Sequence, residues 1–149
     1  MRIFISIFLV ILTLVILNST VLAQGIQVNA TLSFVDVVDN LDLTKHTSLA
    51  VKNYWKQIKG TEVTWKGTIQ NVKGGRGKAQ ILVANRERRT YKGYNIVLVT
   101  YNIDAAADLV LNQEITFTGL IYNYKGRKGN PIIIYLDEVV ILTKPDNKK

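Results

Sequence analysis

Two stretches of this sequence share one pattern, and that pattern constrains the fold more than any other feature. Residues 62–69 read EVTWKGTI and residues 114–121 read EITFTGLI. Apolar and polar residues alternate in both, as in a β-strand that buries one face. In each stretch an aromatic residue is followed, two positions later on the same face, by a glycine, as at Trp65 and Gly67. Because glycine permits a sharp bend or bulge, the pattern predicts two bent strands of a small barrel.

Three further stretches favour β-strands. They cover residues 79–84, 94–101 and 132–142, where apolar and β-branched residues dominate. Between the third and fourth strands, residues 104–111 predict a short helix, with Asp104 as its N-cap and three alanines after it. The order strand, strand, strand, helix, strand, strand is typical of the OB-fold, a five-stranded Greek-key barrel. We therefore expect a mainly β chain that forms this barrel.

An amphipathic helix over residues 44–59 is expected to precede the barrel. Four apolar residues share one side of this helix: Ala50, Val51, Tyr54 and Ile58. The opposite side carries a stripe of lysines: Lys45, Lys52, Lys56 and Lys59. Gly60 follows at the position where helices commonly end. Two interpretations of the stripe are open, a solvated face or a face turned toward phosphates or a membrane.

The segment over residues 24–43 is an N-terminal extension of the domain. Apolar residues alternate from Ile26 to Phe34, as they would in a strand, but the spacing then changes. Two interpretations are open here too, an extra edge strand or a segment that drapes over the domain. The domain itself, helix plus OB-fold barrel, is expected over residues 44–142, and residues 143–149 form a charged tail.

The helix and the bent strands together match a known arrangement. Residues 54–60 read YWKQIKG and lead into the first bent strand, while Ala106 and Leu109 precede the second. Over residues 43–142 this arrangement resembles the bacterial tRNA_anti-like group of exported OB-fold proteins. The resemblance implies an OB domain with a preceding helix. The name of the group records kinship to anticodon-binding domains and does not by itself establish a tRNA ligand.

Residues 1–23 have the features of a secretory signal peptide. Arg2 is followed by an apolar run over residues 3–17, and Val21 and Ala23 place small residues at the −3 and −1 positions of a cleavage site. The run is shorter than the roughly 20 residues that span a bilayer. We therefore expect export to a bacterial periplasm or to the exterior, with membrane tethering by an uncleaved signal as the alternative.

Composition narrows the chemistry of the domain. The sequence carries 19 Lys and Arg against 11 Asp and Glu, for a formal charge of +8. A cationic surface attracts phosphate backbones, anionic lipids or acidic polysaccharides. The lack of cysteine excludes disulfides, thiolate nucleophiles and Cys-based zinc sites, and a lone His46 cannot form a multi-histidine metal centre. We expect no cofactor and no metal.

Basic residues concentrate in three predicted loops, between strands one and two, two and three, and four and five. In that order the loops hold Lys73, Arg76 and Lys78; Arg86, Arg88, Arg89 and Lys92; and Lys125, Arg127 and Lys128. Three nearby tyrosines have flat rings for stacking: Tyr94, Tyr122 and Tyr124. OB-folds bind oligonucleotides or oligosaccharides with the first and last of these loops and the face between them. Turn geometry and solubility are the competing explanation for loop cations.

Cations that follow a phosphate backbone, combined with aromatic platforms, are typical of single-strand binding. The sequence therefore predicts a non-enzymatic exported module that binds a polyanion, most plausibly single-stranded nucleic acid. The alternative is an envelope structural or interaction protein that binds a protein or a glycan. A nuclease on this fold is disfavoured, because Asp137 and Glu138 are adjacent in the last strand and would point to opposite faces. His46 is interpreted as a surface residue.

Overall fold

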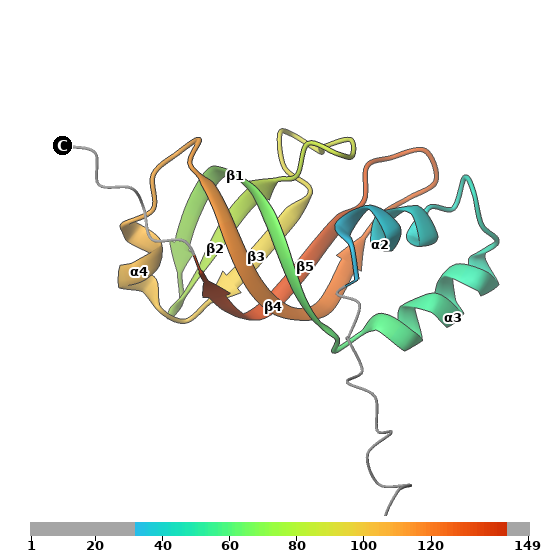
Figure 1. Ribbon diagram of the computed structural model, residues 1–149, viewed down its shortest axis with the longest axis horizontal. Coiled ribbons are helices and arrows are strands. Elements are labelled where there is room, and N and C mark those ends of the chain that lie inside the picture. The colour runs from blue at the N-terminus through green and yellow to red at the C-terminus, as the bar shows by residue number, and fades with distance from the viewer. Residues whose placement is uncertain (1–31, 143–149) are drawn as a thin grey trace, which may run out of the picture. The chain divides into compact units, whose positions relative to one another are not determined.

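A computed structural model describes residues 32–142 of the chain. The elements in this range are α2 (Phe34–Leu41), α3 (Ser48–Ile58), β1 (Glu62–Gly75), β2 (Lys78–Ala84), β3 (Ile96–Thr100), α4 (Ile103–Ala107), β4 (Glu114–Lys125) and β5 (Ile133–Ile141). Figure 1 shows the strands as a barrel, with α4 at one end and α2 and α3 at the other. The predicted signal peptide, residues 24–31 of the extension and the charged tail lie outside the described residues.

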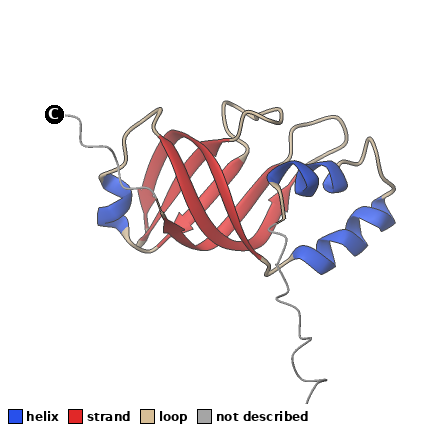
Figure 2. Cartoon of the chain, in the orientation of Figure 1, coloured by secondary structure: helices blue, strands red, loops and turns tan. Residues whose placement is uncertain are grey.

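The five strands close into a barrel in the order β1-β2-β3-β5-β4. Neighbouring strands are antiparallel except for β3 and β5, which are parallel. This is the topology of an OB-fold, so the predicted fold class is confirmed. Because β2 and β4 both run antiparallel to β1, the β1–β2 hairpin lies at one end of the barrel. The β2–β3 loop and the β4–β5 loop lie at the other end, as Figure 2 shows.

The two stretches that share a pattern pair with each other across β1 and β4. The register places Trp65 opposite Phe117, and each glycine opposite a branched aliphatic residue of the other strand. A Cβ atom at Gly67 would overlap the Cγ1 atom of Val83 and lie 2.9 Å from the carbonyl oxygen of Ala84 on β2. Glycine is therefore required at this position by the close approach of β1 and β2, and the pattern serves barrel closure as expected.

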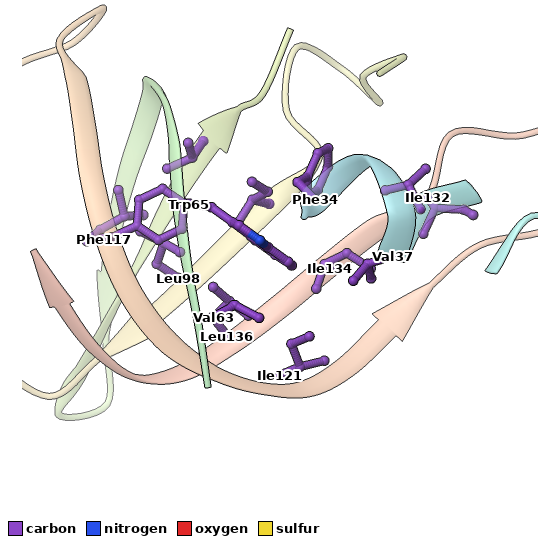
Figure 3. Close-up of a cluster of buried hydrophobic side chains, with 14 of the residues drawn as sticks. Phe34, Val37, Val63, Trp65, Leu98, Phe117, Ile121, Ile132, Ile134 and Leu136 are labelled. Carbon is purple, nitrogen blue, oxygen red and sulfur yellow. The ribbon is translucent and has the colours of Figure 1, made fainter. Parts of the chain in front are cut away.

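Apolar side chains from all five strands fill the barrel interior. In β1 and β4 one face is buried and the alternate residues point outward, as the alternation predicts. Figure 3 shows the rings of Trp65 and Phe117 among aliphatic side chains of β3 and β5, including Leu98, Ile134 and Leu136. Burial of one such side chain contributes about 1.5–3 kcal/mol. This cluster is therefore the main source of stability in the barrel.

Helix α2 covers the barrel end near the start of β1. The ring of Phe34 packs edge-on against Trp65, with centroids 5.2 Å apart, and the Nε1 of Trp65 donates to the carbonyl oxygen of Leu32 at 2.7 Å. The sequence left open an edge strand that would reach Phe34, but a helix begins there instead. The reason is local, because the Ser33 side chain caps the first turn and the buried residues recur at helical spacing: Phe34, Val37, Val38 and Leu41.

Helix α3 is shorter than predicted, because Thr47 caps its first turn and the residues before it form a turn. The helix ends before Gly60, whose φ of 84° fits the predicted C-terminal glycine. Val51 and Ile58 are buried, whereas Ala50, which was expected on the same side, is exposed. The buried side of α3 is thus narrower than the apolar side predicted from the sequence.

Helix α4 follows β3 and is also shorter than predicted. Its N-cap is Asn102, whose side chain accepts a hydrogen bond from the backbone N–H of Ala105, so the expected cap Asp104 lies inside the first turn. The chain then turns through Asn112, which has a φ of 64°, and enters β4. The predicted helix over residues 104–111 is therefore too long at its C-terminal end, because α4 ends at Ala107 with Asp108 as its C-cap.

Candidate functional site

A second apolar cluster lies on the outside of the barrel, over β2, β3 and β5. Neighbouring residues of a strand point to opposite faces, so the residues between the interior ones face outward: Leu82, Val97, Val99 and Ile133. These four side chains are only 6%, 2%, 4% and 4% exposed, and Tyr94 and Tyr135 pack against them. OB-folds place ligands on the face of strands two and three. We call these six residues, together with Tyr122, the outer face.

Tyrosines border the apolar floor of the outer face. Tyr122 and Tyr135 pack edge to face, with ring centroids 6.1 Å apart. Tyr122 is 37% exposed, so part of its ring is accessible. Burial raises the pKa of both phenols, and the nearby carboxylate of Asp137 adds to the rise at Tyr122. Both hydroxyls therefore stay protonated at neutral pH and can donate hydrogen bonds.

The structure places the three predicted tyrosines differently. Tyr94 and Tyr122 belong to the outer face. Tyr124 packs against the barrel interior and against Trp55 of α3, with ring centroids 4.7 Å apart, so it supports α3. The sequence-based selection omits Tyr135, which alternates with the interior residues of β5 and so points outward. Strict alternation along β5 is the signal that identifies it.

The β1–β2 hairpin presents three predicted cations at one end of the outer face: Lys73, Arg76 and Lys78, all exposed. Arg76 and Gly77 form the two-residue turn, with φ of 49° and 78°, as in a type I′ turn. A Cβ atom on Gly74 or Gly75 would meet nothing within 4 Å. Within residues 32–142 no acid pairs with these cations, because the ion pairs there join Asp39 to Lys45 and Arg88. The hairpin charges are therefore available to a partner.

The other two loops carry predicted cations at the opposite end of the barrel, except that Lys125, predicted in the last loop, is the final residue of β4. Six of these cations are exposed: Arg86, Arg89, Lys92, Lys125, Arg127 and Lys128. The Nζ of Lys92 lies 5.6 Å from the ring centre of Tyr91, whose backbone pairs with Tyr94. The β2–β3 loop thus leads into Tyr94, and the β4–β5 loop leads into Ile133. A ligand that crosses the outer face would meet cations at both ends of its path.

Arg88 differs from the other loop cations. Its Nε and one terminal nitrogen donate to the two carboxylate oxygens of Asp39 at 2.8 and 2.6 Å, and its other terminal nitrogen donates to the carbonyl oxygen of Glu87. The hydrogen bond from Arg88, assisted by Lys45 at 3.1 Å, holds the pKa of the Asp39 carboxyl below its usual value. Arg88 therefore ties the β2–β3 loop to α2.

Asn95 fixes the β2–β3 loop from the inside. Its side chain is 0% exposed. The Oδ1 accepts from the backbone N–H of Asn85 at 2.8 Å, and the Nδ2 donates to the carbonyl oxygens of Asn85 at 2.8 Å and Arg88 at 3.3 Å. Buried amides are stable only when they are paired in this way. The loop cations are thus presented from a fixed backbone.

A cleft of about 250 Å³ lies where α2, the β2–β3 loop and the β4–β5 loop meet. Val38 and Ile132 form apolar parts of its lining, and the Asp39 ion pairs occupy another part. Arg89 also lines the cleft and makes no ion pair within residues 32–142. The cleft joins the two basic loops at this end of the barrel.

Within residues 32–142, no group of three or more His, Asp or Glu residues is placed to hold a metal ion. No helix of that range has the length and apolar character needed to cross a membrane. His46 is exposed in the turn between α2 and α3.

The barrel topology makes this chain an OB-fold protein. Among solved structures with a similar fold is a "putative nucleic acid-binding lipoprotein" from Klebsiella pneumoniae, with 14% identity, a TM-score of 0.51 and coverage of 76% of this chain and 91% of that one. An OBody bound to hen egg-white lysozyme has 17% identity, a TM-score of 0.41 and coverage of 60% and 83%. The aspartyl tRNA synthetase of Entamoeba histolytica has 8% identity, a TM-score of 0.41 and coverage of 58% of this chain and 19% of that one. No family model and no curated protein matches the sequence.

Proposed function

We propose that this chain is an exported, non-enzymatic OB-fold module that binds single-stranded nucleic acid across the outer face. The observation that supports this most is the partly exposed ring of Tyr122 beside the tyrosines that pack on a buried apolar floor, with exposed cations at both ends. Bases stack on the exposed part of the tyrosine rings, while Lys and Arg at the ends of the face neutralise phosphates. The combination of tyrosines and cations on one face supports this ligand more than either feature does alone.

The roles of individual residues follow from their exposure. Tyr122 is the accessible stacking platform, with Tyr135 behind it holding the ring in place. Arg76 and its neighbours in the β1–β2 hairpin contact phosphates at one end, where open glycine backbone also lets N–H groups approach an anion. Arg89 and Arg127 do so at the other end. Arg88 contributes indirectly, by keeping the β2–β3 loop in place.

Export and nucleic-acid binding are supported by different observations. The apolar leader with small residues at Val21 and Ala23 supports export. The Klebsiella protein, described as nucleic acid-binding and as a lipoprotein, shares the fold over most of both chains. At 14% identity this likeness concerns the fold, so the proposal for the ligand depends on the outer face of this chain.

The test is a salt titration of binding to a fluorescein-labelled oligothymidylate of about 15 nucleotides, followed by anisotropy. We expect binding at about 50 mM salt that weakens steeply as salt rises. Tyr122→Ala should weaken binding about 5- to 100-fold, since a stacked base contributes about 1–3 kcal/mol. Tyr122→Phe, the matched control, keeps the ring and should bind nearly as wild type.

Two outcomes contradict the proposal. One is no binding at low salt by a protein whose circular dichroism shows the folded barrel. The other is tight, salt-independent binding to a neutral glycan, for which tyrosine rings are also suitable platforms. That second result would establish the alternative of an envelope interaction protein with a carbohydrate ligand.

A further inference from the structure

Helix α3 carries a lysine face on the side opposite to its buried residues. Lys52, Lys56 and Lys59 recur at i, i+4 and i+7, which places them on one stripe, and all three are exposed. Val51 and Ile58 hold the other side of the helix against the rest of the domain. In Figure 1 α3 lies beyond α2, away from β2 and β3. Packing therefore fixes the stripe toward solvent, at a distance from the outer face.

The charges of this face are not balanced locally. Residues 43–61 contain four lysines and no acid. Lys45 pairs with Asp39, whereas Lys52, Lys56 and Lys59 make no ion pair within residues 32–142. Like charges at i and i+4 destabilise a helix. The stripe therefore weakens α3 slightly, and solubility alone would be served as well by charges of mixed sign.

An exposed aliphatic side chain distinguishes this face from a phosphate-binding surface. Leu49 lies three residues before Lys52 on the same side and is 65% exposed. The aromatic residues of the helix, Tyr54 and Trp55, are partly buried and pack toward the barrel. Single-stranded nucleic acid is stabilised by exposed aromatic rings. An anionic lipid surface instead favours lysines at the headgroups and an aliphatic side chain that enters the boundary of the acyl chains.

We propose that the lysine face of α3, formed by Leu49, Lys52, Lys56 and Lys59, docks the domain on an anionic phospholipid surface. Each lysine near such a surface raises the partition coefficient about fivefold, so the three lysines together contribute about 100-fold. This gives reversible rather than permanent attachment. The β1–β2 hairpin is at the other end of the barrel and stays free to meet its ligand.

The experiment is cosedimentation of the full chain with vesicles of phosphatidylglycerol and phosphatidylcholine, compared with vesicles of phosphatidylcholine alone. An apolar leader, if retained, contributes equally to binding of both kinds of vesicle. The difference in binding between the two kinds therefore measures the electrostatic contribution. Wild type should partition about 100-fold more strongly onto the anionic vesicles. The triple variant Lys52→Gln, Lys56→Gln and Lys59→Gln should lose most of this preference, and Leu49→Ser should lose several-fold at every salt concentration.

The matched control removes three charges from the β1–β2 hairpin, through Lys73→Gln, Arg76→Asn and Lys78→Gln. This control should keep its preference for anionic vesicles and bind the oligonucleotide more weakly, while the α3 variant should do the reverse. Equal binding of wild type to both vesicle compositions overturns the proposal, as does an equal loss in both triple variants. If the α3 variant loses oligonucleotide binding and keeps vesicle binding, the lysine face belongs to a nucleic-acid site and the proposal is wrong.

Discussion

The β1–β2 hairpin and the β2–β3 loop both carry clustered cations, but the chain holds them in different ways. In the hairpin, Arg76 and its neighbours are exposed, and a Cβ atom on Gly74 or Gly75 would meet nothing within 4 Å. In the β2–β3 loop, the buried side chain of Asn95 forms hydrogen bonds with the loop backbone, and Arg88 forms an ion pair with Asp39 of α2. A basic loop can therefore be a contact surface or part of the framework, and the difference depends on which acids and amides the fold brings to it.

The largest difference between the two regions should appear in stability. Asn95→Ala leaves the N–H and carbonyl groups of Asn85 without their partner in a partly buried site, at a cost of about 1–3 kcal/mol for each unpaired group. We expect the free energy of unfolding to fall by about 3 kcal/mol, measured by urea denaturation. The comparison variant is Asn71→Ala in the exposed part of β1, which should change it by less than about 0.5 kcal/mol. If Asn95→Ala and Asn71→Ala lower the free energy of unfolding by similar amounts, the β2–β3 loop is not held more firmly than the exposed part of β1.

The second prediction concerns ligand affinity. Replacing the three hairpin cations through Lys73→Gln, Arg76→Asn and Lys78→Gln should weaken oligonucleotide binding about 30-fold at low salt. It should also reduce the slope of log affinity against log salt by about 2, because each phosphate contact on a single strand contributes about 0.7. Stability should not fall, since no described residue forms an ion pair with these side chains and asparagine suits the turn conformation of Arg76. An unchanged salt slope would show that the hairpin does not contact phosphate.

The smallest effect on stability is expected at the ion pair between Asp39 and Arg88, and it depends on pH. Because Arg88 lowers the pKa of Asp39 from 3.8 in the folded state, its contribution to stability is present above about pH 4 and is lost as pH falls through the lowered value. Asp39→Asn should therefore lower the urea midpoint at pH 7, and the difference from wild type should disappear in strong acid. Asp108→Asn is the control, an exposed carboxylate without an ion pair in residues 32–142. If Asp39→Asn lowers the urea midpoint equally at all pH values, the contribution of Asp39 to stability does not come from its charge.

Most of the barrel could be predicted from the sequence, because its determinants are local. Alternation in β1 and β4, the apolar run of β2 and the short helix before β4 each produce their element from neighbouring residues. Helix α2 was missed although its signal is also local. The alternation that ends at Phe34 looked like a strand, and the helical repeat that begins at the same residue competes with it.

The site was predicted less completely, because its arrangement depends on contacts between distant residues. Arg88 and Asp39 are separated by 49 positions, so no local pattern shows that this arginine is occupied. Tyr124 lies against α3 because the register of β4 shifts near its end, which periodicity does not reveal. Of the hairpin cations only Arg76 lies in the turn, whereas Lys73 and Lys78, predicted in the loop, lie in the ends of β1 and β2, because the two-residue turn lets both strands continue to it.

The pairing of Trp65 with Phe117 has a consequence for how the chain reaches this structure. The residues joined by β1 and β4 lie roughly 50 positions apart in sequence, and the barrel cannot close until they meet. Chains dominated by such distant pairings fold over milliseconds to seconds, much more slowly than helical domains. During that interval the apolar faces of both strands are open to other chains. We expect refolding yield to fall as protein concentration rises, even though the five described strands form a closed barrel once folding is complete.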